Sequence, residues 1–415
     1  MLVQPAVMER KKVFGLNPNV FFLGMVSLLT DVSSEMIFTL LPLFLANVLG
    51  TTTVVIGFIE GVAESTASLL KVVSGWISDK LGKRKFLAIV GYGISTVAKP
   101  FMYIATTWGL VFGVRFADRL GKGVRTAPRD ALVADSVAPE ERGKGFGIHR
   151  AMDTSGAALG LVIAAAVVFL LQRGSLELAR GTYQWLVLVG IVPAVLALFM
   201  FAFVRESSRG PGSQASSIST ESQLYSEKVS VGARAGFDNR FKFFLGIMFL
   251  FSLGNSSDAF LILRAQDLGN STLYILIMLV LFNVTYAAIA TPAGVISDKL
   301  GRRKVLILGW GVYVLVYLGF AAASTSLQVW LLFVLYGLYY GLAEGVARAF
   351  VADLVPEDRR GTAYGLFHGV VGIALFPASV IAGWLWQTIN PATPFYFGAG
   401  LASLAMLGLV VLIRE

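Results

Sequence analysis

The sequence of 415 residues contains no cysteine and only two histidines, His149 and His368. Without cysteine, disulfides, thiolate metal sites and thiol catalysis are excluded. Two histidines are too few for a multi-histidine metal centre. The chain also lacks a nucleophile–base constellation and an ATP-binding loop. We therefore expect neither an enzyme nor a cofactor.

Charge is also scarce: 14% of the residues are charged and 56% are hydrophobic, and the mean hydropathy is +0.73. A soluble protein of this length could not bury so much apolar surface. Apolar stretches of 18 to 25 residues recur along the chain, and at about 1.5 Å per residue each can cross a hydrocarbon core of about 30 Å. The alternating ten-residue segments of membrane barrels are absent. The sequence predicts an all-α membrane protein.

Twelve transmembrane helices are predicted. Their approximate ranges are 18–46, 53–77, 86–105, 107–133, 144–171, 183–204, 240–266, 271–297, 304–323, 328–354, 361–388 and 393–413. The first apolar run is too long for a signal peptide, so it is expected to remain as the first helix.

The net charge of +9 comes from Lys and Arg residues that gather in alternate loops. By the positive-inside rule these loops and both termini are cytoplasmic, and the membrane is expected to be the bacterial cytoplasmic membrane. The basic charge therefore indicates topology and not a nucleic-acid partner.

A polar stretch rich in Ser and Gly lies in the middle of the chain and cannot form a packed core. It divides the chain into an N-terminal six-helix bundle (1–205), a cytoplasmic linker (206–238) and a C-terminal six-helix bundle (239–415). Such a two-bundle design can work as a monomer in contact with membrane lipid.

One loop signature occurs twice. The segment from Gly75 to Lys85, Gly-Trp-Ile-Ser-Asp-Lys-Leu-Gly-Lys-Arg-Lys, recurs 219 residues later from Gly294 to Lys304 as Gly-Val-Ile-Ser-Asp-Lys-Leu-Gly-Arg-Arg-Lys. A second loop, Pro139-Glu-Glu-Arg-Gly, recurs in similar form from Pro356 to Gly361. Internal repeats of this length are typical of secondary transporters.

These loops resemble those of the major facilitator superfamily, and in particular its bacterial proton-coupled efflux members. The resemblance implies two pseudo-symmetric six-helix bundles, alternating access by rocking of one bundle on the other, and a substrate cavity between them. The loops are expected to form a conformational latch, in which the first glycine of each signature permits close helix approach; simple topology anchors are the alternative. The latch residues are Gly75, Asp79, Arg84, Arg142, Gly294, Asp298, Arg303 and Arg359.

Ionisable residues inside the predicted spans are the best candidates for function, because a charge near the bilayer centre normally faces a cavity or a partner. Ser-Ser-acid triplets end at Glu35 in the first span and at Asp258 in the seventh. These carboxylates are expected to face each other across the cavity, with Asp31 one turn from Glu35. Such a cluster can hold a proton or a cation; a structural pair with Lys or Arg is the alternative.

The fourth span carries Arg115 and Asp118, and Arg115 resembles the arginine that the family's antiporters associate with proton coupling. The predicted substrate or coupling residues are Asp31, Glu35, Arg115, Asp118, Asp153, Asp258 and Arg264. Secondary candidates are Glu60, Glu64, Lys99, Glu344 and Arg348.

Three of the secondary candidates carry specific expectations. Glu60 and Glu64 share a helix face with Lys71, which predicts either a relay or an ion pair. Lys99 is expected to reach the outer side or a carboxylate, and Glu344 to pair with Arg348, four residues on.

The resulting functional prediction is secondary active transport, driven by a proton gradient, that exports a small organic cation, drug-like compound or metabolite. One alternative is a divalent metal exporter with Asp31, Glu35 and Asp258 as oxygen ligands. Another is a proton symporter that imports an anionic metabolite, with Arg115, Arg264 and Lys99 as its partners.

Overall fold

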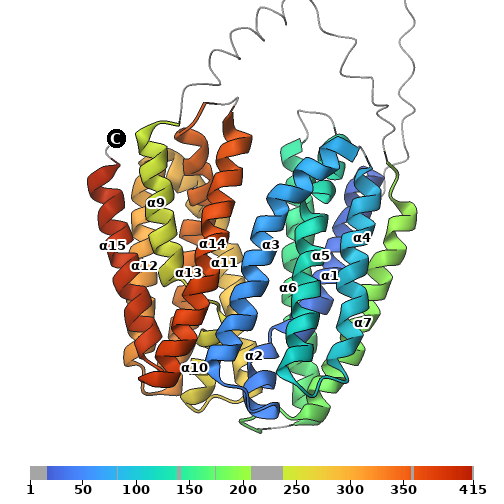
Figure 1. Cartoon of the computed structure of the whole chain (residues 1–415), viewed down its shortest axis with the longest axis vertical. Coiled ribbons are helices and arrows are strands. Elements are labelled where there is room, and N and C mark those ends of the chain that lie inside the picture. The colour runs from blue at the N-terminus through green and yellow to red at the C-terminus, as the bar shows by residue number, and fades with distance from the viewer. Residues whose placement is uncertain are drawn as a thin grey trace, which may run out of the picture.

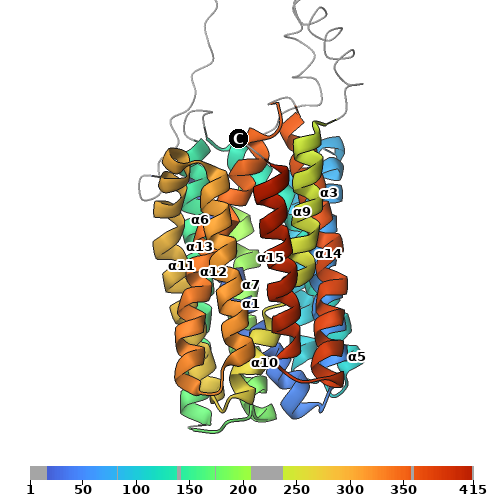
Figure 2. The ribbon, with the colours of Figure 1, turned by 90° about the vertical axis from the view of Figure 1, so that its left-hand side faces the viewer.

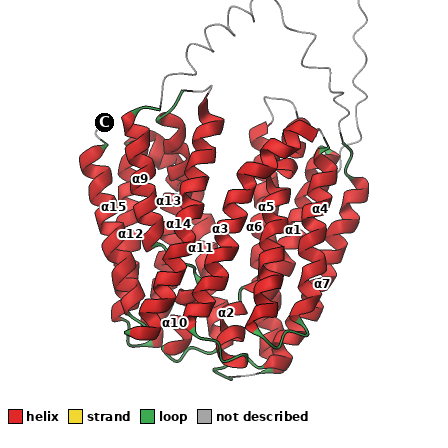
Figure 3. Ribbon diagram, viewed as in Figure 1, coloured by secondary structure: helices red, strands yellow, loops and turns green. Residues whose placement is uncertain are grey.

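A computed structural model describes residues 16–81, 83–137, 142–172, 174–206, 237–356 and 359–413. Within these ranges the chain is helical and contains no β-strand (Figure 3). Most of the predicted linker, residues 207–236, lies outside the described residues.

The first half supplies six membrane-crossing segments. They are α1 (Pro18–Phe38) continued by α2 (Leu41–Leu43) and the π-helical turn η1 (Phe44–Val48), α3 (Thr53–Leu81), α4 (Arg84–Ala98) continued by the 3-10 turn η2 (Lys99–Met102), α5 (Trp108–Asp135), α6 (Arg142–Leu171), and α7 (Arg180–Met200) continued by η4 (Phe201–Phe203).

The second half supplies six more. They are α9 (Asn239–Gly254) with α10 (Ala259–Asp267), α11 (Thr272–Leu300), α12 (Arg302–Ala322), α13 (Ser326–Asp353), α14 (Arg360–Thr388) and α15 (Thr393–Leu412). Ten of the twelve segments are long and apolar enough to cross a membrane by themselves. The other two are α4, which has 15 residues, and the highly charged α5. The predicted helical fold is confirmed, with boundaries that differ by a few residues.

Large apolar side chains cover the outside of the molecule, among them Leu170, Leu315 and Leu327, which are 68% to 79% exposed. Such exposure suits helices that face lipid, because hydrocarbon solvates these side chains and the helix satisfies its own backbone hydrogen bonds. The cores of the bundles instead hold aromatic rings such as Trp310, Tyr313 and Tyr317.

The two six-helix bundles stand side by side, with α1 to α7 in one and α9 to α15 in the other (Figures 1 and 2). Contacts between α3 and α14 and between α6 and α11 join them. We call the end that holds residues 83–84 and 300–302 the signature end, and the other the opposite end. The C-terminus lies at the signature end, where the ribbons of α3 and α14 diverge (Figure 1).

Glycines close the opposite end. A Cβ placed on Gly57 of α3 would lie 2.2 Å from the carbonyl oxygen of Ser379 in α14, and one on Gly383 of α14 would lie 2.3 Å from that of Thr53. Real Cβ contacts are longer than 3.0 Å, so these backbones approach as closely as they do only because the side chains are absent.

The glycines of the loop signature make no such contact. A Cβ on Gly75 would meet the Cβ of Ala127 at an ordinary 3.5 Å, and one on Gly294 would meet no described atom within 4 Å. In this conformation neither glycine brings two helix backbones into contact, so the predicted close approach stays a prediction.

Candidate substrate cavity

A cavity of about 430 Å³ lies between the bundles. One wall comes from α1, α3 and α5, and the other from residues 255–262 together with α11, α13 and α14. The structure brings seven of the predicted residues into its lining, namely Asp31, Glu35, Glu60, Glu64, Arg115, Asp118 and Asp258.

Helix α1 is placed by two glycines of α6. A Cβ on Gly156 would lie 2.3 Å from the carbonyl oxygen of Leu28, and one on Gly160 would lie 2.6 Å from that of Val32. This Gly-x-x-x-Gly pair lets the backbones of α1 and α6 touch. The acidic face of α1, with Asp31 and Glu35, then lines the cavity.

The seventh span breaks where it meets the cavity. Helix α9 ends at Gly254, whose carbonyl oxygen accepts a hydrogen bond of 3.0 Å from the Tyr313 hydroxyl. Helix α10 begins after Asp258, which is exposed in the cavity wall and accepts a hydrogen bond of 2.7 Å from the Tyr336 hydroxyl. The break satisfies freed backbone groups with side chains, as irregular backbone within a membrane protein requires.

Ion pairs join α3 to α5, and one of them is buried. Arg115 Nη2 lies 2.7 Å from Glu60 Oε2, with both side chains 5% exposed. Glu64 Oε1 lies 3.6 Å from the same nitrogen and 3.0 Å from Nη2 of Arg119. The prediction left a Glu–Lys relay with Lys71 open; the described ion pairs of Glu60 and Glu64 are instead with arginines of α5, because α5 packs along α3.

The remaining charged wall of α5 leads from the cavity toward the signature end. Asp118, Lys122 and Arg125 line it. Arg125 donates a hydrogen bond of 2.9 Å to the Ser95 hydroxyl and stacks on the Tyr92 ring at 4.3 Å from its centre. The Oδ1 atom of Asp118 is buried and has no hydrogen-bond partner among the described residues.

Four cavity carboxylates make no ion pair within the described part of the chain: Asp31, Glu35, Asp118 and Asp258. Glu35 accepts a hydrogen bond of 2.5 Å from the Thr39 hydroxyl, and Asp258 is bonded to Tyr336. They lie on opposite bundles, and Asp258 is within electrostatic range of Glu35. Glu60 and Glu64 are paired to arginines, Asp31 contacts Asp153, and Asp118 lies within electrostatic range of Lys99. Glu35 and Asp258 therefore remain to act on a bound molecule.

Lys99 was expected to reach the outer side or a carboxylate, but it does neither: among the described residues it forms no ion pair. It is fully buried, and its ammonium donates hydrogen bonds of 2.8 Å and 3.1 Å to the hydroxyls of Ser33 and Ser34. The residue lies where α4 passes into η2, within the first bundle, so its side chain spans the short distance to α1.

Arg264, expected to bind an anionic cargo, is not part of the cavity lining. Its guanidinium donates to the carbonyl oxygens of Phe320 and Ala323 at 3.1 Å and 3.0 Å and pairs with Asp267. The last carbonyl groups of a helix have no hydrogen-bond donors within that helix, and Arg264 supplies donors to them at the end of α12.

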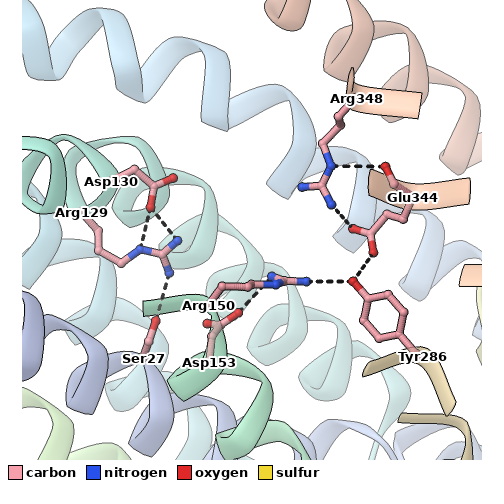
Figure 4. A network of polar contacts seen from close by, with 8 residues as sticks. All are labelled: Ser27, Arg129, Asp130, Arg150, Asp153, Tyr286, Glu344 and Arg348. Carbon is pink, nitrogen blue, oxygen red and sulfur yellow. Dashed lines mark hydrogen bonds and ion pairs between the residues drawn. The ribbon is translucent and has the colours of Figure 1, made fainter. Parts of the chain in front are cut away.

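A second polar group lies beside the cavity and links the two bundles (Figure 4). The carboxyl groups of Asp31 and Asp153 are in contact. Arg150 of α6 lies 3.1 Å from Asp153 and donates a hydrogen bond of 3.4 Å to the Tyr286 hydroxyl of α11. Tyr286 in turn donates a bond of 2.7 Å to Glu344 of α13.

The predicted pair of Glu344 and Arg348 is confirmed at 2.8 Å. Arg150 and Tyr286, which connect this pair to Asp153, were not predicted. The i, i+3 spacing of Arg150 and Asp153 could have indicated their ion pair, but nothing in the sequence places Tyr286 beside Arg150.

The proposed metal ligands do not form a site. Among the described residues, no group of three or more His, Asp or Glu side chains is close enough to hold a metal ion. Asp31 instead contacts Asp153, and Asp258 sits on the other bundle with Tyr336.

The signature residues brace each bundle from within in this conformation. Arg84 of α4 pairs with Asp135 of α5, Asp298 lies 3.4 Å from Arg302, and Arg303 donates to the carbonyl oxygens of Leu409 and Val410 in α15 at 3.3 Å and 2.7 Å. Arg359 occupies the N-cap position of α14, with no capping hydrogen bond from its side chain. The side chains of Asp79 and Arg142 lie outside the described residues. A latch between the bundles therefore stays a prediction.

Comparisons with known proteins agree with this architecture. The sequence model of the Major Facilitator Superfamily matches residues 23–260 and 243–415. The chain is 38% identical over 401 residues to an uncharacterized MFS-type transporter of Methanocaldococcus jannaschii, with 94% of each chain covered. It is 22% identical to a multi-drug resistance efflux pump of Streptococcus pneumoniae, over 79% of each chain. The crystal structure of a D-xylose–proton symporter superposes with a TM-score of 0.74 at 17% identity, covering 96% of this chain and 98% of that one.

Proposed function

Because this chain belongs to the major facilitator superfamily, and is thus a secondary transporter in a membrane and not an enzyme, we propose that it exports small organic cations in exchange for protons. The signature end then faces the cytoplasm, as the distribution of Lys and Arg predicts. The cavity, which is closed at the opposite end by the glycine contacts of α3 and α14, is ready to receive cargo from the cytoplasm.

The observation that carries this proposal is the pair of carboxylates without basic partners, Glu35 and Asp258. A carboxylate in a low-dielectric cavity is costly unless a counter-charge is present. A cationic cargo between the two bundles supplies that charge to both at once. It also gives each bundle a contact that changes when the bundles rock.

The cavity wall favours a cation with an apolar body. Phe38, Phe282 and Tyr340 line the same space, and aromatic faces attract organic cations. A volume of about 430 Å³ is within the range of small-molecule sites. An anionic cargo is less well served, because neither Lys99 nor Arg264 lines the cavity. Of the basic residues that do, Arg115 and Arg119 are paired with Glu60 and Glu64. Arg125 is held by Ser95 and the Tyr92 ring, which leaves Lys122.

Proton coupling is supported by the contact between Asp31 and Asp153. Two ionised carboxylates in contact repel each other, and one shared proton removes the repulsion. The side chain of Asp153 is 18% exposed, so the pair has access to water. The efflux pump among the relatives favours export as the direction.

The test is transport in proteoliposomes with a lumenal pH dye under an imposed pH gradient. Tetraphenylphosphonium, divalent metal ions and aromatic carboxylates serve as three separate cargo panels. We expect the organic cation to evoke proton movement in the wild type, and Glu35→Gln and Asp258→Asn to lose it. Glu177→Gln, a change of an exposed carboxylate outside the cavity, is the matched control. Movement evoked by anions alone, or undiminished cation binding in both cavity variants, would overturn the proposal.

A further inference from the structure

We propose that Arg150 is a proton-dependent clamp between the two bundles: it holds α6 against α11 while the Asp31–Asp153 pair is ionised and releases when that pair takes up a proton. The inference rests on the proposed proton coupling and assigns its structural link. Arg150 acts here as a positioning residue, because it transmits the charge of the pair and does not itself contact the cargo.

The first step of the argument is where this contact joins the bundles. The hydrogen bonds that Thr53, Gln266 and Thr272 make between the bundles lie at the opposite end. Arg150 lies eight residues from the start of α6, which is at the signature end, and meets Tyr286 in the middle of α11. A change at Arg150 therefore acts on the half of the molecule that must close around cargo.

The second step is the charge that holds Arg150. The groups around the Asp31–Asp153 pair are Lys122, Arg125 and Arg129 of α5 and His149 and Arg150 of α6. Arg129 is fixed, since it donates to Asp130 at 2.8 Å and to the Ser27 hydroxyl at 3.1 Å (Figure 4). Arg125 is likewise held by Ser95 and the Tyr92 ring.

Arg150 differs from these fixed groups because its side chain is 56% exposed and its contacts are an ion pair and one long hydrogen bond. A proton taken up by the pair lies on Asp31, whose carboxyl group then donates to Asp153 and draws the Asp153 charge away from the guanidinium. With the ion pair weakened, the hydrogen bond of 3.4 Å to Tyr286 alone is too weak to hold the guanidinium between the bundles, and water can solvate it.

The third step is how the second bundle receives the change. The Tyr286 hydroxyl bridges Arg150 to Glu344, which is held in turn by Arg348. The Tyr286 ring also lies 6.5 Å from Phe282 and 6.0 Å from Tyr340 between ring centres. Since Phe282 and Tyr340 line the cavity, movement of Tyr286 reaches the wall that also holds Asp258.

The sequence of events gives exchange a direction. Loss of the proton to the cytoplasm restores the ionised pair, so the clamp favours closure of the signature end once cargo is bound. Uptake of a proton from the other side weakens the clamp and favours reopening toward the cytoplasm. Cargo and proton thus favour opposite conformations, which exchange requires.

The experiment measures the clamp without any cargo. Because the chain has no cysteine, spin labels can be placed on cysteines introduced at Phe146 of α6 and Val295 of α11, both exposed. Their separation is measured in lipid nanodiscs by pulsed electron resonance across a series from neutral to acidic pH. We expect the separation to increase on acidification in the wild type.

In Asp153→Asn and Arg150→Gln the separation should stay at its acidic value at every pH, while Arg150→Lys should restore part of the response. Arg180→Gln, at the opposite end, is the matched control and should respond like the wild type. If Arg150→Gln does not fold, Tyr286→Phe tests the same link. A pH response that is unchanged in Arg150→Gln, or in Tyr286→Phe, would overturn the clamp.

The outcome is independent of the cargo proposal. A pH response that requires Arg150, together with no cation-evoked proton movement in proteoliposomes, would support the clamp and overturn the proposed cargo. Cation-coupled proton movement in proteoliposomes, together with a label separation that does not depend on pH, would support the proposed cargo and overturn the clamp.

Discussion

Gly57 of α3 rests against the backbone of Ser379 in α14, so closely that an added Cβ would lie 2.2 Å from the Ser379 carbonyl oxygen. Gly61 makes a similar contact with Phe376 one turn further, at 2.9 Å. These contacts hold the two bundles together at the opposite end. An outward-open state must separate them, so the glycines set the balance between the two conformations.

Gly57→Val should shift that balance toward the state that is open at the opposite end. Inserting side-chain atoms into a packed contact costs about 1–3 kcal/mol, which changes the ratio of the two states by about 5- to 150-fold. Labels at Thr52 and Thr388, both exposed, report the separation of α3 and α14. Gly113→Val, where an added Cβ meets no described atom within 4 Å, should leave the distance unchanged. Equal distances in both variants would contradict the interpretation.

Glu60→Gln should cost more stability than Glu344→Gln. The first change leaves the buried Arg115 without its nearest counter-charge, which costs about 3–5 kcal/mol when no partner replaces it. The second change affects side chains of Glu344 and Arg348 that are 38% and 43% exposed, and such pairs contribute about 0–1 kcal/mol. Thermal unfolding in one detergent compares the two directly. A similar loss in both would show that Glu64 compensates fully for Glu60.

Gly156→Ala should destabilise the protein and weaken cargo binding together. The added methyl would lie 2.3 Å from the Leu28 carbonyl oxygen and push α1, with Glu35, away from α6. We expect a loss of about 1–3 kcal/mol, measured by thermal unfolding alongside a binding titration with tetraphenylphosphonium. Gly147→Ala in the same helix has open space and should be neutral or gain up to about 1 kcal/mol from helix propensity. Wild-type binding in Gly156→Ala would mean that α1 is not placed by this contact.

Arg264→Ala should lower the melting temperature and leave the affinity of the cavity for cargo unchanged. Its guanidinium satisfies carbonyl oxygens at the end of α12, and hydrogen bonds of a charged group contribute about 1.5–3 kcal/mol. Glu35→Gln should show the opposite pattern, with little change in stability and lost binding. A loss of cargo binding in Arg264→Ala at wild-type stability would instead show that Arg264 takes part in cargo binding.

The candidate site was only partly predictable. The Ser-Ser-acid triplets placed Glu35 and Asp258 on one cavity because the repeat relates the two halves, and the structure brings both to its lining. The partners of the arginines were not foreseeable in the same way. Helical periodicity put Glu60, Glu64 and Lys71 on one face of α3, but the rotation of α5 decided that Arg115 and Arg119 meet the two glutamates.

The sequence by itself determined the twelve spans, their helical form and the two related halves, since in lipid each span must satisfy its own backbone hydrogen bonds and cover itself with apolar side chains. Both requirements apply to each segment separately, so the sequence of a segment is enough to predict that it is a membrane-spanning helix. The tertiary structure alone decided that Lys99 binds serines, that Arg264 caps α12 and that Arg150 reaches Tyr286 across the bundles. Each of these contacts depends on how neighbouring helices are rotated and how far apart they stand. Their physical origin is packing between segments, such as the glycine contacts of α6 with α1 and of α3 with α14.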